Sequence, residues 1–444
     1  MKETQLQMSL PGVPRAKQGR EVAQEWEWTE ASVWTERMLA TLERGIKGGK
    51  WFSLIDKVWK RENLESATKQ VLRNKGGAGV DGLTCEQYRR KAPERLERLQ
   101  EQIKSGNYNP SPVKRVWIEK LGSKELRPLG IPTVEDRIVQ TALRNVIEPI
   151  FENVFAEHSY GFRSGRGAKD ALRRVDQLLK AGKVWVVDAD LKAYFDSIPQ
   201  DKLLAAVEEH ISDGAVLDLI GKMLRQGVME TGKGWKPTET GTPQGAVISP
   251  LLANIYLNPL DHRMAQAGKE MVRYADDFVV LCESQKEAEE VLEILRQWVD
   301  AAGLTLHPTK TRIVDASQKG GFEFLGYHFE RGHRWPRQKS IDKFRETIRE
   351  KTRRLDPRPM REMVANVNKT LKGWFGYFRH SVKNVFPRQD QFVRRRLRTV
   401  LRRRHKLRGR GRGLDHQRWP NAYFAELGLI SLALARDKAS RSQR

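Results

Sequence analysis

The sequence predicts an α+β fold, in which helices and paired strands are followed by a group of basic helices. An apolar run from Val184 to Val187 has the composition of a buried strand, and it ends at the acidic segment 188–190. Two apolar arms between Met271 and Leu281 flank a short acidic turn, as in two strands joined by a hairpin. After about His333 the chain changes to helical patterns rich in lysine and arginine.

The composition predicts a polyanionic partner. Lysine and arginine number 81 among the 444 residues, against 56 acidic residues, so the formal net charge is +25. A basic surface gains affinity for nucleic acid because it releases counterions from phosphates. The alternatives are a secreted or ribosome-associated basic protein and attraction to a membrane surface. Residues 1–20 lack the apolar core of a secretory signal, and no window of about 18 apolar residues could span a bilayer.

Length and cysteine content bound the architecture. A chain of this length predicts two to four domains, and an apolar fraction of 39% is enough for a sizeable core. The two cysteines, Cys85 and Cys282, lie far apart and have no metal-ligand spacing. A disulfide framework and a cysteine-based zinc site are therefore not expected, and we expect a reducing, cytoplasmic setting.

The N-terminal half is predicted to be mainly helical, with one pair of strands. A helical pattern from Trp26 to about Arg73 ends at a glycine-rich stretch, residues 76–82. Extended segments follow around Val113–Ile118 and Leu126–Ile131. Asp136–Phe151 is predicted to be a helix that ends at its proline.

The basic C-terminal region is predicted to contain three helices that form a small bundle, because each has one apolar face. The last thirty residues, after the Arg/Gly stretch 408–413, show no clear element. The three faces are marked by Ile341, Phe344, Ile348 and Leu355, by Val364, Val367, Leu371, Trp374 and Phe378, and by Phe392, Val393, Leu397, Val400 and Leu401. Trp374 is expected to be a core residue of this bundle.

Aspartates stand at the ends of the central strands. Asp190 closes the first strand, and Asp276 and Asp277 occupy the turn of the hairpin. An Asp-Asp pair alone is most often a solvated turn, but apolar arms hold this pair near a core. Such charges stay ionised only with a counter-ion, and a metal is the simplest one. Two-metal phosphoryl transfer uses carboxylates on adjacent strands to bridge two cations about 3.5–4 Å apart.

Three motifs resemble those of reverse transcriptases and occur in the same order. Val187–Asp196 resembles motif A, Gly241–Gly245 with Ser249–Asn254 resembles motif B, and Tyr274–Asp277 resembles motif C. The resemblance is greatest to the bacterial group II intron reverse transcriptases, or maturases, in the form that lacks the C-terminal endonuclease domain.

Further blocks extend this resemblance over roughly residues 51–412. Arg127–Thr133, Asp136–Gln140 and Tyr160–Arg166 resemble the family's fingers, Leu304–Val314 its motif D, Phe324–Tyr327 the exit of its palm and Leu371–Arg379 its thumb. The resemblance implies a right-hand polymerase with fingers, an antiparallel-sheet palm and a three-helix basic thumb. The implied boundaries are an N-terminal extension at 1–50, fingers at 51–182, a palm with the catalytic motifs at 183–330, a thumb or maturase domain at 331–412 and a C-terminal tail at 413–444.

The resemblance also implies a metal site. Asp190 and Asp276 would ligate both of two Mg²⁺ ions, with Asp277 beside them and the Leu191 carbonyl as a further ligand. Mn²⁺ is the alternative metal. One ion would lower the pKa of the attacking 3′-hydroxyl, and the other would neutralise the triphosphate and the departing pyrophosphate.

Three of the implied nucleotide-binding residues would act on the sugar and the triphosphate. Phe195 matches the position where an aromatic ring lies under the sugar and excludes a 2′-hydroxyl; its alternative is a core phenylalanine. Lys120 and Arg127 resemble the fingers cations that hold the triphosphate, since an Arg fork suits phosphate oxygens. Lys124 competes with Lys120 for this role.

Three more residues complete the implied nucleotide site. Gly245 would let the backbone approach the nascent base pair, and Gln244 would reach the template or the nucleotide. Simple loop chemistry is the alternative for both. Lys310 would protonate the leaving pyrophosphate, or else is a surface lysine near a helix end.

The segment from Arg394 to Arg412 is dense in arginine, and the nearest acidic residue before it is Asp390. A solvated charged face normally mixes in acidic residues, so binding to a structured RNA is the better interpretation. The candidate RNA-binding residues are Arg394, Arg395, Arg396, Arg402, Arg403 and Arg404.

The resemblance implies an RNA-directed DNA polymerase of a group II intron. Its partners would be an RNA template with a DNA primer, dNTPs, the parent intron RNA and target DNA, and it would assist splicing and retrotransposition. The family often adds a C-terminal Cys/His endonuclease domain, for which Leu414–Arg444 is too short.

Three alternatives remain at this point. One is an RNA-binding splicing factor with an inactive polymerase fold, which the intact aspartates disfavour. Another is a domesticated reverse transcriptase in DNA repair or defence. The third is an RNA-dependent RNA polymerase, which Phe195 disfavours, as does Ala275 where such enzymes usually carry glycine.

Overall fold

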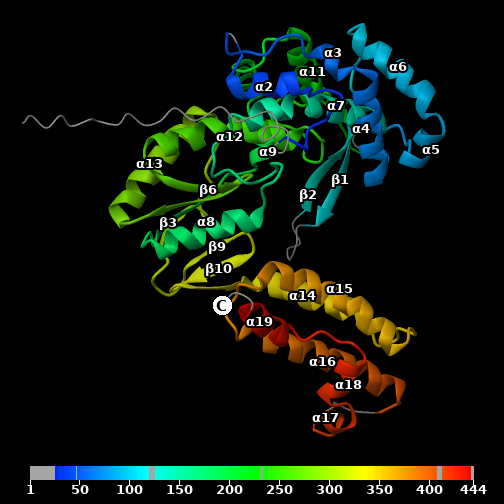
Figure 1. The fold of residues 1–444 in the computed structure, drawn as a ribbon, viewed down its shortest axis with the longest axis vertical. Helices are drawn as coiled ribbons and strands as arrows, with labels where there is room; N and C mark the ends of the chain where they lie inside the picture. The colour runs from blue at the N-terminus through cyan, green and yellow to red at the C-terminus, as the bar shows by residue number, and fades with distance from the viewer. Residues whose placement is uncertain are drawn as a thin grey trace, which may run out of the picture. The chain divides into compact units, whose positions relative to one another are not determined.

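A computed structural model describes residues 26–46, 48–119, 126–230, 232, 234–407 and 413–441. Lys120, its competitor Lys124 and residues 408–412 of the arginine-rich segment lie outside the described residues. The chain forms two compact units (Figure 1). The first comprises residues 1–116, 129–155 and 198–256, and the second comprises 117–128, 156–197 and 257–444.

Helices dominate the first unit. Its centre is α7 (Val134–Glu152), which begins where the Thr133 hydroxyl accepts a hydrogen bond from Asp136 N at 3.1 Å. Most of its residues are buried, as expected for a helix surrounded by protein. Pro149 lies inside α7 rather than at its end. The other helices are α2 (Glu36–Arg44), α3 (Ile55–Val58), α4 (Arg61–Asn74), α5 (Cys85–Arg90), α6 (Ala92–Lys104), α10 (Gln200–Glu208) and α11 (Gly214–Arg225).

The predicted strand pair of the N-terminal half is present as β1 (Val113–Glu119) and β2 (Leu126–Ile131). It extends into a sheet of order β2-β1-β4-β5, with β4 (Val228–Glu230) parallel to β1 and β5 (Gly234–Lys236) antiparallel to β4. Neither β4 nor β5 was expected from the sequence. The single helical pattern before the glycine-rich stretch proves to be three helices, α2 to α4.

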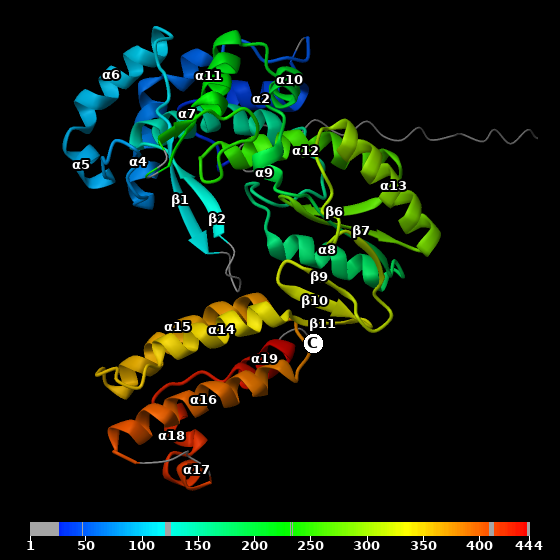
Figure 2. The same cartoon turned by 180° about the vertical axis from the view of Figure 1, so that it is seen from behind.

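The second unit contains an antiparallel sheet of order β6-β7-β3-β8. Its strands are β3 (Trp185–Asp190), β6 (Glu270–Tyr274), β7 (Asp277–Cys282) and β8 (Arg312–Asp315). Helix α8 (Ala168–Lys180) packs on β6 and β7, while α13 (Gln285–Ala301) packs on β3, β7 and β8 (Figure 2). Helix α12 (Ser249–Gln266) begins in the first unit and enters the second, and the one-turn helix α9 (Tyr194–Ser197) follows β3.

A second antiparallel sheet, β11-β10-β9, connects this part of the unit to the basic helices. It is formed by β9 (Phe322–Phe324), β10 (Tyr327–Glu330) and β11 (His333–Pro336). The connection is fixed by two hydrogen bonds. The Tyr327 hydroxyl donates to the Tyr377 carbonyl at 2.7 Å, and the Tyr377 hydroxyl donates to the Leu325 carbonyl at 2.8 Å.

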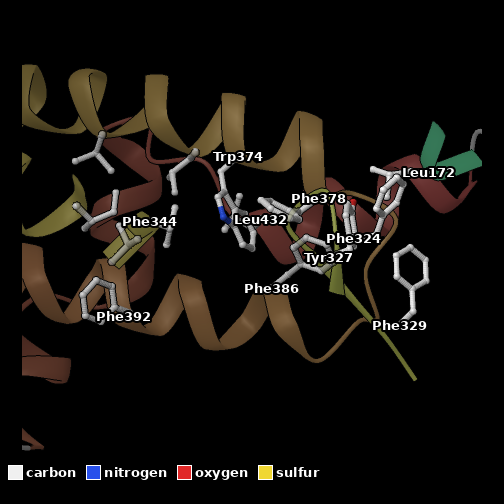
Figure 3. Packing of buried hydrophobic residues seen from close by; sticks show 14 of the residues in the cluster. Leu172, Phe324, Tyr327, Phe329, Phe344, Trp374, Phe378, Phe386, Phe392 and Leu432 are labelled. Carbon is white, nitrogen blue, oxygen red and sulfur yellow. The ribbon is translucent and has the colours of Figure 1, made fainter. Parts of the chain in front are cut away.

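The three predicted basic helices are α14 (Gln338–Lys351), α15 (Met360–Phe378) and α16 (Val385–Arg404). Their apolar faces form one buried cluster, in which Trp374 lies 4.8 Å from Phe344 and 5.1 Å from Phe378 between ring centroids (Figure 3). The prediction that Trp374 is a core residue is confirmed. The prediction that Leu355 belongs to an apolar face is wrong, because α14 ends at Lys351 and Leu355 is 79% exposed.

The C-terminal residues, for which the sequence indicated no clear element, form α17 (Leu414–Arg418), α18 (Asn421–Glu426) and α19 (Leu432–Arg441). Helix α19 packs on α16. The buried Asp390 carboxylate of α16 accepts hydrogen bonds from the main-chain N–H groups of Leu432 at 2.9 Å and Ala433 at 3.1 Å. Asp390 therefore caps α19 and does not compensate the arginines that follow it.

Candidate active site

The structure brings the predicted aspartates together at one end of the β3–β7 strand pair. Asp190, the last residue of β3, is the direct cross-strand partner of Asp277, the first residue of β7. Asp276 immediately precedes Asp277 in the two-residue loop between β6 and β7. Directly opposed residues in an antiparallel pair project to the same face, so the carboxylates of Asp190 and Asp277 are neighbours.

A fourth carboxylate, Asp188, lies two residues before Asp190 and projects to the same face of the sheet. Arg312 on β8 donates from Nε to Asp188 Oδ2 at 3.3 Å. No role was predicted for Asp188 from the sequence. Its position in the Asp-Ala-Asp segment at the end of the strand could have indicated one.

The electrostatics of this cluster favour a cation. Burial, together with repulsion by the charges of Asp276, Asp188 and Asp190, raises the pKa of Asp277 from 3.8 to about 7. Burial also raises the pKa of Asp276, with a smaller contribution from Asp190, while Arg127 and Arg273 oppose the shift. Burial raises the pKa of Asp188 against the influence of Arg312. A bound cation would relieve this repulsion.

Hard carboxylate oxygens are the donors that Mg²⁺ and Mn²⁺ prefer, so the donor set fits a divalent ion. As the side chains stand, however, no group of three or more His, Cys, Asp or Glu residues within the described ranges is arranged to hold one. Instead, the Lys310 ammonium contacts Asp190 Oδ2 at 2.6 Å. Lys310 is thus a cation beside Asp190 in this conformation.

The segment before Lys310 is attached to the end of β3 by the main chain. His307 N donates to the Asp190 carbonyl at 2.7 Å, and Lys192 N donates to the Thr305 carbonyl at 2.9 Å. Leu191, whose carbonyl is a predicted metal ligand, lies between these bonds and pairs with Leu306 in an isolated bridge. These bonds hold the backbone of the segment that leads to Lys310 beside the end of β3.

The turn that carries Asp276 is stabilised by a hydrogen bond from a buried arginine, Arg273. Ala275 has a φ of +60°, a region that costs a non-glycine residue about 1–2 kcal/mol. Arg273 is fully buried and donates from Nη1 to the Ala275 carbonyl at 3.0 Å. Its Nε donates to both carboxylate oxygens of Asp261 on α12, at 2.8 Å and 3.0 Å. The sequence signal for this residue was a charged side chain within an apolar strand.

Gly161 packs against the same turn from the segment that precedes α8. A Cβ at this position would lie 2.8 Å from the Tyr274 carbonyl carbon and still nearer to the Ala275 nitrogen. Real Cβ atoms do not approach backbone this closely, so only glycine fits without moving the turn. Gly161 lies in Tyr160–Arg166, the block that resembles the family's fingers, but no role was predicted for it from the sequence.

Two predicted nucleotide-binding residues lie in the second unit near the carboxylates. Arg127 on β2 is one of the charges that lower the pKa of Asp276, although burial outweighs it. Phe195 lies in α9, five residues after Asp190, and its half-buried ring meets Tyr194 edge to face at 5.6 Å. Phe195 is therefore not a fully buried core residue.

Gln244 and Gly245 belong to the first unit, where their loop packs on β2. The Gly130 N–H donates to the Gln244 carbonyl at 2.6 Å. Gly245 has a φ of +104°, and a Cβ there would lie 2.6 Å from the Gly130 carbonyl oxygen. Both the backbone conformation and the close approach require glycine at 245.

The six candidate RNA-binding arginines divide into two groups. Arg396 donates to the Thr352 carbonyl at 2.8 Å, Arg402 pairs with Asp415 at 2.8 Å, and Arg404 donates to the Asp356 carbonyl at 3.2 Å. These three hold the helical region together. In contrast, Arg395 and Arg403 are exposed on α16, and Arg394 is half-buried there.

Comparisons with known proteins agree with this geometry. Residues 118–329 match the family described as "Reverse transcriptase (RNA-dependent DNA polymerase)", and residues 341–419 match "Group II intron, maturase-specific domain". Over 311 residues the chain is 35% identical to Protein YkfC of Escherichia coli. This match covers 61% of this chain and 81% of YkfC. Over 206 residues it is 37% identical to Group II intron-encoded protein LtrA of Lactococcus lactis, which covers 46% of this chain and 34% of LtrA.

The chain therefore spans most of YkfC and about a third of the length of LtrA. No helix among the described residues is long and apolar enough to cross a membrane. The predicted α+β fold class of a polymerase, with an antiparallel sheet and basic helices, is confirmed. On the two matched domains and the identity to YkfC, the chain belongs to the group II intron reverse transcriptases, a family of RNA-directed DNA polymerases that carry a maturase domain.

Proposed function

We propose that this protein extends a DNA primer on an RNA template by two-metal nucleotidyl transfer. The observation that carries the proposal is the direct pairing of Asp190 with Asp277, beside Asp276. Burial and repulsion between the carboxylates raise the pKa values of Asp276 and Asp277. Such a cluster is poised to receive divalent cations. Asp190, Asp276 and Asp277 would hold two Mg²⁺ ions, with the Leu191 carbonyl as a further ligand.

The bound ions would supply charge for activating the 3′-hydroxyl and for stabilising the leaving pyrophosphate. The chain's own residues would do the rest. The Arg127 guanidinium would bind triphosphate oxygens through its planar fork, and Phe195 would exclude nucleotides with a 2′-hydroxyl. As the bond between the α- and β-phosphates breaks, the Lys310 ammonium would donate its proton to the pyrophosphate. Its 2.6 Å contact with Asp190 supports this role, because it keeps the ammonium beside the reacting groups.

The same chain would bind its intron RNA and assist splicing and mobility. The match of residues 341–419 to the maturase-specific domain supports this part of the proposal, as does the density of arginine on α16. dNTPs, the RNA template with its primer and the target DNA would be the further partners. Splicing would not need the carboxylates, because binding to RNA requires no nucleotidyl transfer.

Primer extension on an RNA template tests the polymerase activity. Asp276→Asn should abolish extension, because it removes a metal ligand, whereas Asp300→Asn should extend like the wild type. Asp300 is an exposed aspartate on α13, so the two variants differ only in where the same chemical change is made. Equal extension by the wild type and Asp276→Asn would contradict the proposal. A splicing assay on a candidate intron with Asp276→Asn separates the maturase role, which should persist.

A further inference from the structure

The basic helices line a cavity that is open to solvent and whose lining is mostly arginine. Its volume is about 670 Å³, and it lies between α14, α16 and the start of the α17–α18 segment. Seven of its thirteen lining residues are arginines, and Asp415 is the only carboxylate among the described residues that line it. That carboxylate is already paired with Arg402 at 2.8 Å. The walls therefore carry a large excess of positive charge.

Three of these guanidinium groups gather around one aromatic ring. Arg345 and Arg349 from α14 and Arg395 from α16 lie 5.4, 5.6 and 5.6 Å from the centroid of the Phe392 ring. Phe392 itself is buried at the end of the apolar cluster (Figure 3). Cation–π attraction holds each guanidinium on the ring, but the three like charges repel one another. Two helices thus contribute to a site that an anion would stabilise.

The protein compensates little of this charge. Within the described ranges no ion pair to a carboxylate is formed by Arg349, Arg394 or Arg395. Arg398 is buried, and its acceptors among the described residues are neutral: the Trp419 carbonyl at 3.0 Å and Asn421 Oδ1 at 2.9 Å. Burial lowers the pKa of Arg398, and the charge of Arg394 lowers it further. Several of these arginines thus lack the acidic partners that structural arginines normally have.

A second cavity continues the first toward the β10–β11 sheet. It has a volume of about 520 Å³, and both cavities are lined by Arg345 and Arg388. At its other end lie Trp335 and His328, whose ring centroids are 4.9 Å apart. An arginine-lined groove that ends at aromatic rings fits a nucleic-acid strand with unpaired bases, because phosphates meet guanidinium groups while bases stack. An acidic peptide would meet the charge but leave the aromatic end unused.

We propose that this groove, lined by Arg345, Arg349, Arg388, Arg395 and Trp335, binds an unpaired segment of RNA, with backbone phosphates at the arginines around Phe392. The proposal rests on the proposed function only for the choice of RNA as the nucleic acid. In this proposal the RNA contact is not confined to the arginine-rich helix α16, because Arg345 and Arg349 come from α14. It also separates groove arginines from Arg396 and Arg404, which bind the protein's own carbonyls.

Equilibrium binding to a short fluorescein-labelled single-stranded RNA tests the groove in the full chain. The double variant Arg345→Gln/Arg349→Gln should bind about tenfold more weakly. The slope of its logarithmic binding constant against logarithmic salt concentration should be shallower by about 1.4, because two phosphate contacts are lost. The matched control is Arg361→Gln/Lys372→Gln, which removes two charges from exposed positions on α15. The control should retain wild-type affinity and slope. Equal losses in both double variants would overturn the proposal, because only net charge would then matter.

A second variant keeps the test independent of folding. Trp335→Leu removes no charge, and it should weaken binding of single-stranded RNA more than binding of a fully paired RNA of the same length. An unchanged preference would overturn the placement of bases at Trp335. Poly-glutamate should compete only at high excess; competition as strong as that of unlabelled RNA would instead favour an acidic protein partner and overturn the RNA assignment.

Primer extension by the wild type distinguishes this inference from the proposed function. If the wild type does not extend a primer but its RNA binding depends on Arg345 and Arg349, the polymerase proposal fails and the groove stands. If the wild type extends a primer and the groove variants bind RNA normally, the groove proposal fails alone.

Discussion

Arg273 and Asp261 form a buried ion pair next to the turn that carries Asp276, one of the proposed catalytic aspartates. Arg273 is fully inaccessible to solvent, and its Nε lies 2.8 Å and 3.0 Å from the two carboxylate oxygens of Asp261. The same guanidinium donates to the Ala275 carbonyl, whose residue has a positive φ. The pair therefore acts as a positioning device for Asp276, since it holds a strained turn in place.

The first prediction separates the stability of this pair from its positioning role. Arg273→Met should lower the free energy of unfolding by about 3–5 kcal/mol, because it leaves the Asp261 charge buried without a partner. Arg273→Met/Asp261→Leu should recover much of that loss, since an apolar pair can replace a buried ion pair. Primer extension should remain impaired in the double variant, because no donor reaches the Ala275 carbonyl. Denaturant unfolding and single-turnover extension measure the two effects, and full activity of the double variant would contradict the positioning role.

The second prediction concerns the close packing of Gly161 on the turn. Gly161→Ala should reduce the rate of extension at least tenfold, because its Cβ would displace the backbone at Tyr274 and Ala275. Gly167→Ala is the matched control in the same segment, since the nearest atom to its added Cβ is an Asp170 carboxylate oxygen at 3.9 Å. The control should cost about 1 kcal/mol of stability, because glycine is favoured over alanine at the N-cap of α8. Similar extension rates for the two variants would show that the turn tolerates the displacement.

The third prediction is a pH dependence of stability without metal. The pKa of Asp277 is raised from 3.8 to about 7 in the folded chain, so the folded state binds more protons than the unfolded state between these values. Its contribution to stability is therefore fully present below about pH 4 and is lost as the pH rises to about 7. Asp277→Asn should flatten this part of the profile, measured by thermal unfolding in EDTA. A profile identical to that of the wild type would be evidence against the shift.

The fourth prediction concerns divalent ions. Mg²⁺ or Mn²⁺ should raise the unfolding temperature of the wild type, because binding to the folded state alone stabilises it by about 2.7 kcal/mol at a hundredfold excess over Kd. Asp190→Asn should lose this response, whereas Asp300→Asn, on the exposed side of α13, should keep it. Chelation should abolish primer extension, and restoring either ion should recover it. Persistence of the Mg²⁺ response in Asp190→Asn would place the ion elsewhere.

The fifth prediction tests the sugar gate. Phe195→Ala should increase the incorporation of ribonucleotides relative to deoxynucleotides, because the half-buried ring would no longer obstruct a 2′-hydroxyl. Competition between dNTPs and rNTPs in single-nucleotide extension measures the discrimination ratio. Phe195→Tyr keeps the ring and should keep the ratio. An unchanged ratio in Phe195→Ala would assign the ring to packing against Tyr194 instead.

The sequence by itself determined the hairpin of β6 and β7 that carries the proposed catalytic aspartates. Apolar arms on either side of Tyr274–Asp277 specify two buried strands with a short turn, because a short continuous apolar run is typical of a strand that is covered on both faces. The motif order then predicted the family, the fold class and the aspartates. The three basic helices followed from their apolar periodicity in the same way, apart from the exposed Leu355.

Only the tertiary structure decided which polar side chains act on one another. Asp261 meets Arg273 because α12 packs beside the hairpin, and Gly161 meets Ala275 because a segment more than a hundred residues earlier in the chain lies against the turn. Neighbouring arginines of the same segment also have different partners. Arg396 donates to the Thr352 carbonyl, whereas Arg395 lies over the Phe392 ring together with two arginines of α14. Such contacts join residues that are distant in sequence, so no local pattern specifies them, and packing alone brings them within bonding distance.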